Sequence, residues 1–257
     1  MISVIINAIK IIFLLGFLVI IHEGGHFIVA KLCKVKVNEF SIGFGKAIWK
    51  KQGKETLYSV RIIPLGGYVQ MEGESEDSTD QRAFSNVSIP KRIAIVSAGA
   101  VVNILFGILI YFLLISIVGL QFADPSKDTI LNRIYYGGIH TGDFILSIFD
   151  SVKMLFTNGV SVEQMTGPVG ISQIVVQATG FTNYIYILAI ISVSLGVTNL
   201  LPIPALDGGK IILLIIEAIR RKKITIETEA KITVIGFSII IALSLYVTYH
   251  DVIRLFQ

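Results

Sequence analysis

The chain has 257 residues, of which 53% are hydrophobic and only 16% are charged, and its mean hydropathy is +0.76. A soluble domain of this length must keep a polar surface, so this composition excludes an ordinary soluble protein and indicates a polytopic membrane protein. The single cysteine, Cys33, excludes both an internal disulfide framework and a metal site built from several cysteines.

Four long apolar segments alternate with polar ones along the chain. Each is long enough to cross a hydrocarbon core of about 30 Å. The first has neither a basic start nor a cleavage site, so it is not typical of a removable signal peptide. The sequence therefore predicts an α-helical polytopic membrane protein with about four transmembrane helices, in residues 1–32, 93–120, 183–209 (a span and the turn that follows it) and 232–257.

The basic residues predict which side of the membrane each connecting segment faces. Lysine and arginine number 11 in Lys31–Arg92 and six in Lys210–Lys231, but only three in Gln121–Asn183. Because basic residues near span ends resist translocation, we expect residues 33–92 and 210–231 on the cytoplasmic side and residues 121–182 outside. This topology accounts for the net charge of +4 without a nucleic-acid partner, and it places both chain ends outside.

Residues 33–92 are predicted to form β-hairpins. Glycines and a proline separate four runs in which β-branched and aromatic residues mix with polar ones: Val35–Ile42, Lys46–Lys51, Thr56–Ile62 and Tyr68–Met71. The acidic, serine-containing stretch Glu72–Gln81 is typical of a mobile surface loop. Residues 210–231 predict a basic helix on the same side of the membrane.

The outer region, residues 121–182, falls into two parts. Phe122–Asp150 contains the stretch Gly-Gly-Ile-His-Thr-Gly-Asp at 137–143, which favours a small β-fold fragment. Ser151–Gly180 has apolar residues at mixed spacing, and we expect it to lie along the membrane surface.

The first predicted span carries His22-Glu23-Gly24-Gly25-His26, an HExxH pattern. Residues four apart lie on one face of a helix, so both imidazoles can bind one metal ion. The glutamate that follows the first histidine can reach a metal-bound water as a general base. Ionisable groups in a membrane span are costly and usually functional. The alternative is a pair of interfacial histidines reaching toward water, with Glu23 paired to a lysine.

A catalytic zinc site generally takes a third protein ligand. His140 and His250 are expected on the outer side, and Cys33 would have to fold back to reach the histidines. Asp207 is the best candidate, because the prolines and glycines in Asn199–Gly209 break the helix there, and broken backbone at membrane depth usually lines a cavity. The alternative is that Asp207 only caps the following helix, and spacing alone does not decide between the two.

At this point the sequence resembles the site-2 protease family of intramembrane zinc metalloproteases, in particular the bacterial branch that includes the regulator-of-sigma-E protease. The matching features appear in family order and cover most of the chain: HEGGH at 22–26, Gly99–Asn103, Asn199–Gly209, and Phe40–Gly45 with Pro64–Tyr68. A further match is Thr166–Gly170, before the third span.

The resemblance implies a role for each of these positions. His22, His26 and Asp207 would bind zinc, and Glu23 would activate the water. Asn103 and Asn199 match asparagines that hold the substrate backbone or support the site; the alternative is helix-packing hydrogen bonds. The β-hairpin segment matches a membrane-associated element that presents the substrate as an added strand.

One feature departs from the family pattern. This branch usually carries one or two PDZ domains of about 90 residues outside the membrane, whereas the outer region here has 63 residues, 121–183. Gly138–Asp143 resembles a turn of such a domain, but the continuation is missing after about Asp150. We therefore expect a truncated or missing PDZ domain.

Together these features predict a zinc metalloendopeptidase that hydrolyses peptide bonds in or near transmembrane segments. The expected substrates are single-span membrane proteins or signal peptides, for example anti-sigma factors. The expected location is a bacterial cytoplasmic membrane, with the active site toward the cytoplasm. A non-catalytic binding protein is one alternative, although it would not need Glu23. A zinc transporter is another, but such folds commonly show internal repeats, and none is visible.

Overall fold

The computed structural model describes residues 2–157 and 167–254, and most of them are helical. Among these residues, four helices are long and apolar enough to cross a membrane: Ile5–Leu32, Ile89–Gly119, Gly180–Asn199 and Ile226–Ile253. The prediction of about four membrane-spanning helices is therefore confirmed. The chain divides into two compact units, which we describe separately.

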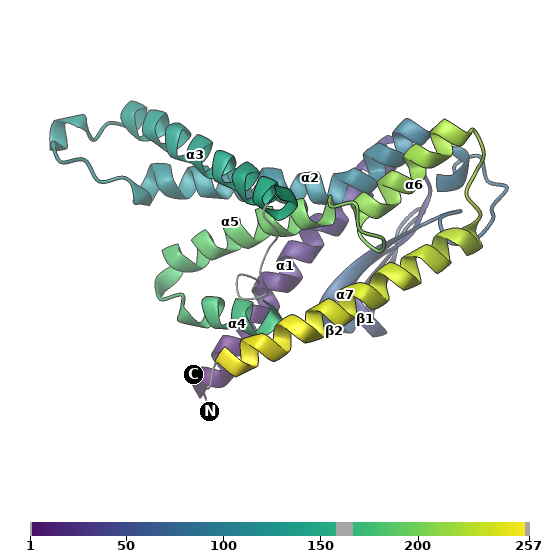
Figure 1. Ribbon diagram of the computed structural model, residues 1–257, viewed down its shortest axis with the longest axis horizontal. Helices are drawn as coiled ribbons and strands as arrows, with labels where there is room; N and C mark the ends of the chain where they lie inside the picture. Colours follow the sequence, from purple (N-terminus) through teal and green to yellow (C-terminus); the bar gives the residue numbers. More distant parts are fainter. Residues whose placement is uncertain (1, 158–166, 255–257) are drawn as a thin grey trace. The chain divides into compact units, whose positions relative to one another are not determined.

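The first unit comprises residues 1–104 and 194–240. Its elements, coloured in Figure 1 by position in the sequence, are α1 (Ile2–Leu32), β1 (Val37–Gln52), β2 (Leu57–Met71), the start of α2 (Ile89–Leu114), the end of α5 (Gly180–Asn199), α6 (Asp207–Arg220) and the start of α7 (Ile226–Arg254). The two strands pack against α1.

The β-hairpin prediction for residues 33–92 is confirmed by a two-stranded antiparallel sheet. Residues 39–42 of β1 take partners from two parts of β2, so Ser41 pairs with both Tyr68 and Ser59. The chain bends between these parts at Gly66, whose φ of +116° is one that residues with a side chain rarely adopt.

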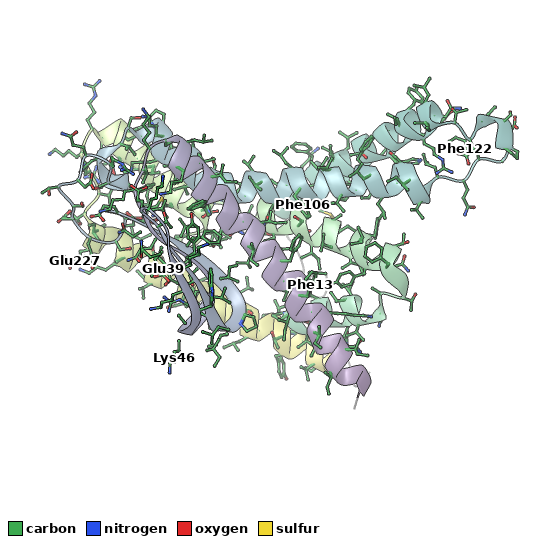
Figure 2. The ribbon with its side chains drawn as sticks, turned by 180° about the vertical axis from the view of Figure 1, so that it is seen from behind. Phe13, Glu39, Lys46, Phe106, Phe122 and Glu227 are labelled. Carbon is green, nitrogen blue, oxygen red and sulfur yellow. The ribbon has the colours of Figure 1, made fainter. Side chains whose placement is uncertain are left out.

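A polar group inside the sheet holds these pairings together. The Glu39 carboxylate accepts hydrogen bonds from Ser59 Oγ at 2.6 Å and from Arg61 Nη2 at 2.7 Å. Burial alone would raise the pKa of Glu39, but these two donors outweigh it and lower that pKa below its usual range. Figure 2 shows Glu39 within the sheet and Lys46 toward its far end.

A hydrophobic cluster joins the sheet to three helices. It is made of buried side chains from α1, both strands, α2, α6 and the segments that connect them: Ala30, Val35, Val37, Met71, Phe84, Ile95, Val96 and Leu214. Because α1 and α6 share this cluster, segments far apart in the sequence are held close together.

The second unit comprises residues 105–193 and 241–257. It contains the end of α2, a π-helical turn (Ile115–Gly119), α3 (Ile130–Thr157), α4 (Pro168–Gln177), the start of α5 and the end of α7. In Figure 1, α3 runs back beside α2, and the stacked rings of Tyr111 and Phe144, 4.1 Å apart, join the two helices.

The β-fold fragment predicted at 122–150 is wrong, because most of this stretch is α3. The first glycine of the Gly-Gly pair that favours a turn in the sequence serves helix packing instead. Gly137 is buried, and a Cβ there would overlap the side chain of Ser116 in the preceding π-helical turn. Glycine therefore allows α3 to approach close to that turn.

The expectation that Ser151–Gly180 lies along the membrane surface stays a prediction. Residues 158–166 lie outside the described residues, and so does Thr166 of the Thr166–Gly170 match. The remainder is the end of α3 and α4, whose Gly170 N–H donates to the Asp251 carboxylate of α7 at 2.9 Å.

A buried ion pair connects α2 to α6. Arg92 Nη1 lies 2.6 Å from Glu217 Oε1, and each side chain is only 8% exposed. Removing one partner leaves an uncompensated buried charge, which typically costs about 3–5 kcal/mol, whereas replacing both with apolar residues is often neutral.

We therefore predict that Arg92→Met and Glu217→Leu each lower the thermal unfolding temperature in detergent markedly, and that the double variant recovers most of the loss. Breaking the Lys231–Glu227 pair, whose side chains are 70% and 79% exposed, is the control and should cost less than about 1 kcal/mol. A double variant as unstable as the worse single variant would contradict this account.

Candidate metal centre

The two histidines of the HExxH pattern lie on one face of α1. Their ring centroids are 4.8 Å apart with the ring planes nearly perpendicular, and His22 Nε2 lies 3.2 Å from His26 Nε2. Both side chains are nearly buried, at 11% and 12% exposure. Two buried imidazoles that present the same ring nitrogen to each other indicate a shared positively charged partner.

Asp207 is the first residue of α6, and the N-cap position is Leu206. Asp207 thus does not cap a helix that starts further along, which decides against the capping alternative. The preceding turn is tightly packed, because a Cβ at Gly208 or Gly209 would overlap backbone oxygens of Leu201 and Ile203. Ala205 has φ +80°, a strained value for a residue with a Cβ.

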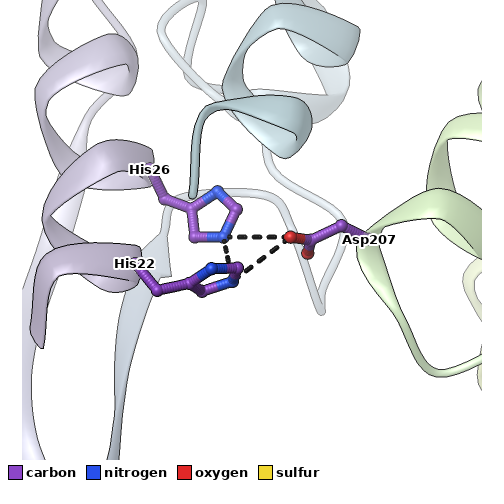
Figure 3. A group of neighbouring side chains, drawn as sticks. All are labelled: His22, His26 and Asp207. Atoms are coloured by element: carbon purple, nitrogen blue, oxygen red, sulfur yellow. Dashed lines mark hydrogen bonds and ion pairs between the residues drawn. The ribbon is translucent and has the colours of Figure 1, made fainter. Parts of the chain in front are cut away.

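The three side chains converge, as Figure 3 shows. Asp207 Oδ2 lies 3.2 Å from His22 Nε2 and 3.5 Å from His26 Nε2, which completes a triangle with the 3.2 Å separation of the two nitrogens. Ligand atoms bound about 2.0–2.2 Å from a tetrahedral metal ion lie about 3.3–3.6 Å from one another. The triangle therefore has the size of one face of a tetrahedral metal site.

Hydrogen bonding also fits metal binding. His26 Nδ1 lies 2.8 Å from the carbonyl oxygen of Ile95, which can only accept, so Nδ1 carries the proton and Nε2 keeps its lone pair for a metal. Asp207 Oδ2 is buried and has no hydrogen-bond donor among the described residues. A buried carboxylate oxygen without a donor is costly unless a cation compensates it.

Glu23 shares a cavity of about 210 Å³ with all three candidate ligands. A Cβ at Gly67 of β2 would lie 3.4 Å from Glu23 Cγ, so this strand passes close to the glutamate. Tyr68, Val69 and Met71 also line the cavity, so β2 forms one of its walls. A carboxylate, three metal-ligating groups and a strand therefore meet in one small space.

A family model for peptidase family M50 matches residues 10–243, which is most of the chain. The chain belongs to peptidase family M50. The predicted resemblance to site-2 proteases is thereby confirmed.

Relatives match this M50 chain over nearly its whole length. A candidate zinc metalloprotease of Clostridium acetobutylicum is 29% identical over 330 positions, covering 96% of this chain and 97% of that protein. The zinc metalloprotease RasP of Bacillus licheniformis is 25% identical over 419 positions, covering 97% and 99%. RasP of Oceanobacillus iheyensis is 24% identical, covering 97% and 99%. The alignments are longer than the 257 residues here, so these relatives contain segments without a counterpart, in agreement with a truncated or missing PDZ domain.

The structure does not bring the two predicted asparagines into the metal cavity of the M50 chain. Asn103 in α2 is completely buried, and Asn199 Nδ2 donates to the Leu195 carbonyl of its own helix at 3.0 Å. Among the described residues that line the cavity, neither appears. Cys33 packs against the hydrophobic cluster, and the metal-binding group found in the described residues contains only His22, His26 and Asp207.

Two cavity residues were missed by sequence reasoning. Lys210 Nζ lies 2.7 Å from Glu74 Oε1 and 3.6 Å from Glu229 Oε1. Burial alone would lower the pKa of Lys210, but the two carboxylates outweigh it and raise that pKa above its usual range. The prediction of a mobile loop at 72–81 concealed Glu74. The one sequence feature that could have indicated a role for Lys210 is its position directly after Asp207-Gly208-Gly209.

Close packing of α2 against the histidines gives a test of the metal centre. A Cβ at Gly99 would overlap the His26 ring and approach His22 Cε1 to 2.9 Å, whereas a Cβ at Gly24 meets nothing within 4 Å. We predict that Gly99→Ala weakens metal binding at least about tenfold, as expected for a change beside the ligands. Gly24→Ala, the matched control, retains the metal.

The measurement is metal content after dialysis against graded chelator. The Gly24→Ala variant should also be slightly more stable, because alanine favours a helix over glycine by about 1 kcal/mol. Equal metal retention in the two variants would contradict the geometry described here.

Proposed function

We propose that this chain is an intramembrane zinc metalloprotease that hydrolyses peptide bonds in or beside the membrane-spanning segments of other proteins. The observation that carries the proposal is the triangle formed by His22, His26 and Asp207, with Glu23 in the same cavity. Membership of a peptidase family and four membrane-spanning helices support it.

The donor set of two imidazoles and one carboxylate suits zinc. Zinc, when bound by His22, His26 and Asp207, supplies Lewis acidity that polarises the scissile carbonyl and activates water. Glu23 accepts the proton of the attacking water and delivers it to the leaving amine. The Ile95 carbonyl fixes the tautomer of His26, and β2 passes close beside Glu23.

The substrate is presented along β2. A helical substrate hides its carbonyl groups, so its backbone must be unwound before cleavage. Residues 67–71 pair with β1 along one edge, and side chains from this stretch line the metal cavity. An unwound segment that pairs with this part of β2 would recover backbone hydrogen bonds beside Glu23.

The orientation and the substrates are also part of the proposal. The concentration of basic residues in 33–92 and 210–231 supports an active site that faces the cytoplasm of a bacterial cell membrane. Single-span proteins and signal peptides, including anti-sigma factors, fit such a site. Asn103 and Asn199 would support the site through helix packing, as the burial of Asn103 and the local hydrogen bond of Asn199 favour.

The test is cleavage of membrane proteins by zinc-loaded protein in liposomes. We predict that Glu23→Gln lowers cleavage by about 10²–10⁴-fold, because it removes the general base, while zinc content stays at one ion per chain. His26→Ala should lose both zinc and cleavage.

Substrates are found by comparing membrane proteomes of cells that carry wild type or Glu23→Gln, since uncut proteins accumulate in the variant. Zinc-dependent cleavage that survives Glu23→Gln would overturn the assigned base. A zinc-loaded wild type that cleaves no membrane protein would favour a binding protein.

A further inference from the structure

A second cavity adjoins the metal cavity and is about twice its size. It measures about 430 Å³, against about 210 Å³, and the two share Glu74, Asp207 and Lys210 among their lining residues. The rest of its lining is mostly apolar and comes from Ser75 and from residues 204–213 and 226–234, including Pro204, Leu206, Leu213, Ile226 and Ala230. An apolar space therefore begins where the candidate metal ligand Asp207 lies.

The Lys210–Glu74 ion pair stands at the junction of the two cavities. Its 2.7 Å contact joins the first turn of α6 to the segment after β2, and the side chains are only 24% and 21% exposed. Lys210 Nζ also lies 3.6 Å from Glu229 in α7 and 4.9 Å from the centre of the Phe84 ring. These three partners hold the ammonium group in place, so the Lys210 side chain forms a fixed wall between the two cavities.

The segment that carries Glu74 is itself held firmly. The neighbouring Glu72 carboxylate accepts hydrogen bonds from Asn38 Nδ2 at 2.9 Å and from Ser78 Oγ at 2.7 Å. Glu72 and Phe84 are also joined by a backbone hydrogen bond of 2.7 Å. Lys210, in α6, and Glu74, in this hydrogen-bonded segment, are therefore both held in place within the first unit.

Cavity volume shows why this wall matters for substrates. Pockets that hold small ligands typically measure about 300–1,000 Å³. The metal cavity alone falls below that range, whereas the neighbouring cavity lies within it. Because the metal cavity must also hold the scissile peptide, a bulky side chain beside that bond gains room by reaching into the apolar cavity, and the ion pair lies at the junction it would have to cross.

We propose that Lys210 and Glu74 are specificity-determining residues, whose ion pair separates the metal cavity from an apolar side pocket and limits the size of the substrate side chain beside the scissile bond. The inference rests on the proposed protease function. Substrates taken from membrane spans are rich in apolar side chains, which matches the lining of the side pocket.

The test uses the zinc-loaded full chain and a single-span reporter that it cleaves, with alanine or phenylalanine placed in turn at each position around the scissile bond. Wild type should prefer alanine at one position. Lys210→Ala removes the wall and should raise the phenylalanine-to-alanine ratio of kcat/KM there by about tenfold or more. Glu74→Gln should raise it less, because its bulk remains.

Two further variants separate specificity from folding. The exchange Lys210→Glu with Glu74→Lys rebuilds the ion pair and should return the ratio toward the wild-type value. Lys31→Ala is the matched control, because the Lys31–Glu55 pair has a similar distance of 2.6 Å and similar exposure of 30% and 29%, but neither residue is among those that line the two cavities. It should leave the ratio unchanged.

A readout independent of turnover is photo-crosslinking in the Glu23→Gln background. A reporter with a photoreactive phenylalanine at the same position should crosslink to residues 226–234 more strongly when Lys210 is alanine. Zinc content should be equal in all variants compared.

A ratio that stays constant while kcat falls equally for both reporters would overturn the inference and make the ion pair a structural tie only. Failure of wild type to cleave any reporter would instead overturn the proposed function.

Discussion

The structure depends on bringing the carboxylate of Asp207 to the two imidazoles of His22 and His26. Burying any of these three groups in an apolar setting costs free energy, and a cation bound between them offsets that cost. The Asp207 oxygen that faces both histidines has no other donor among the described residues, and the Ile95 carbonyl fixes the tautomer of His26. The surrounding packing serves this convergence: a glycine at 99 lets α2 approach the histidines, and glycines at 208 and 209 let α6 begin close against the preceding turn.

Much of this arrangement could be predicted from local rules. The four spans follow from hydropathy over a length set by the bilayer. The placement of His22 and His26 on one face follows from helical periodicity, and the hairpins follow from mixed polar and β-branched runs punctuated by glycine. Asp207 is different, because spacing alone left it between a helix cap and a ligand, and it was the family resemblance that implied a ligand. Tertiary structure then places it opposite the histidines.

Two sequence predictions failed, and both failed for the same physical reason. The structure at each place depends on a partner residue that is distant in the chain. The Gly137–Gly138 pair suggests a turn when considered alone, but Gly137 lies in α3, where its lack of a side chain lets Ser116 pack directly against it. Glu74 belongs to an acidic stretch that resembles a solvated loop, yet Lys210, far along the chain, holds it at the cavity. Patterns of composition do not contain these pairings, so neither a close helix approach nor an ion pair between remote segments could be predicted.

The central claim is that one zinc ion is bound by His22, His26 and Asp207, and X-ray absorption at the zinc edge tests it most directly. The account predicts only nitrogen and oxygen neighbours at about 2.0–2.2 Å, with two imidazole signatures, and loss of one oxygen neighbour or of the ion in Asp207→Ala. A sulfur neighbour at about 2.3 Å, which only Cys33 or a methionine could supply, or an unchanged spectrum in the Asp207→Ala variant, would contradict it.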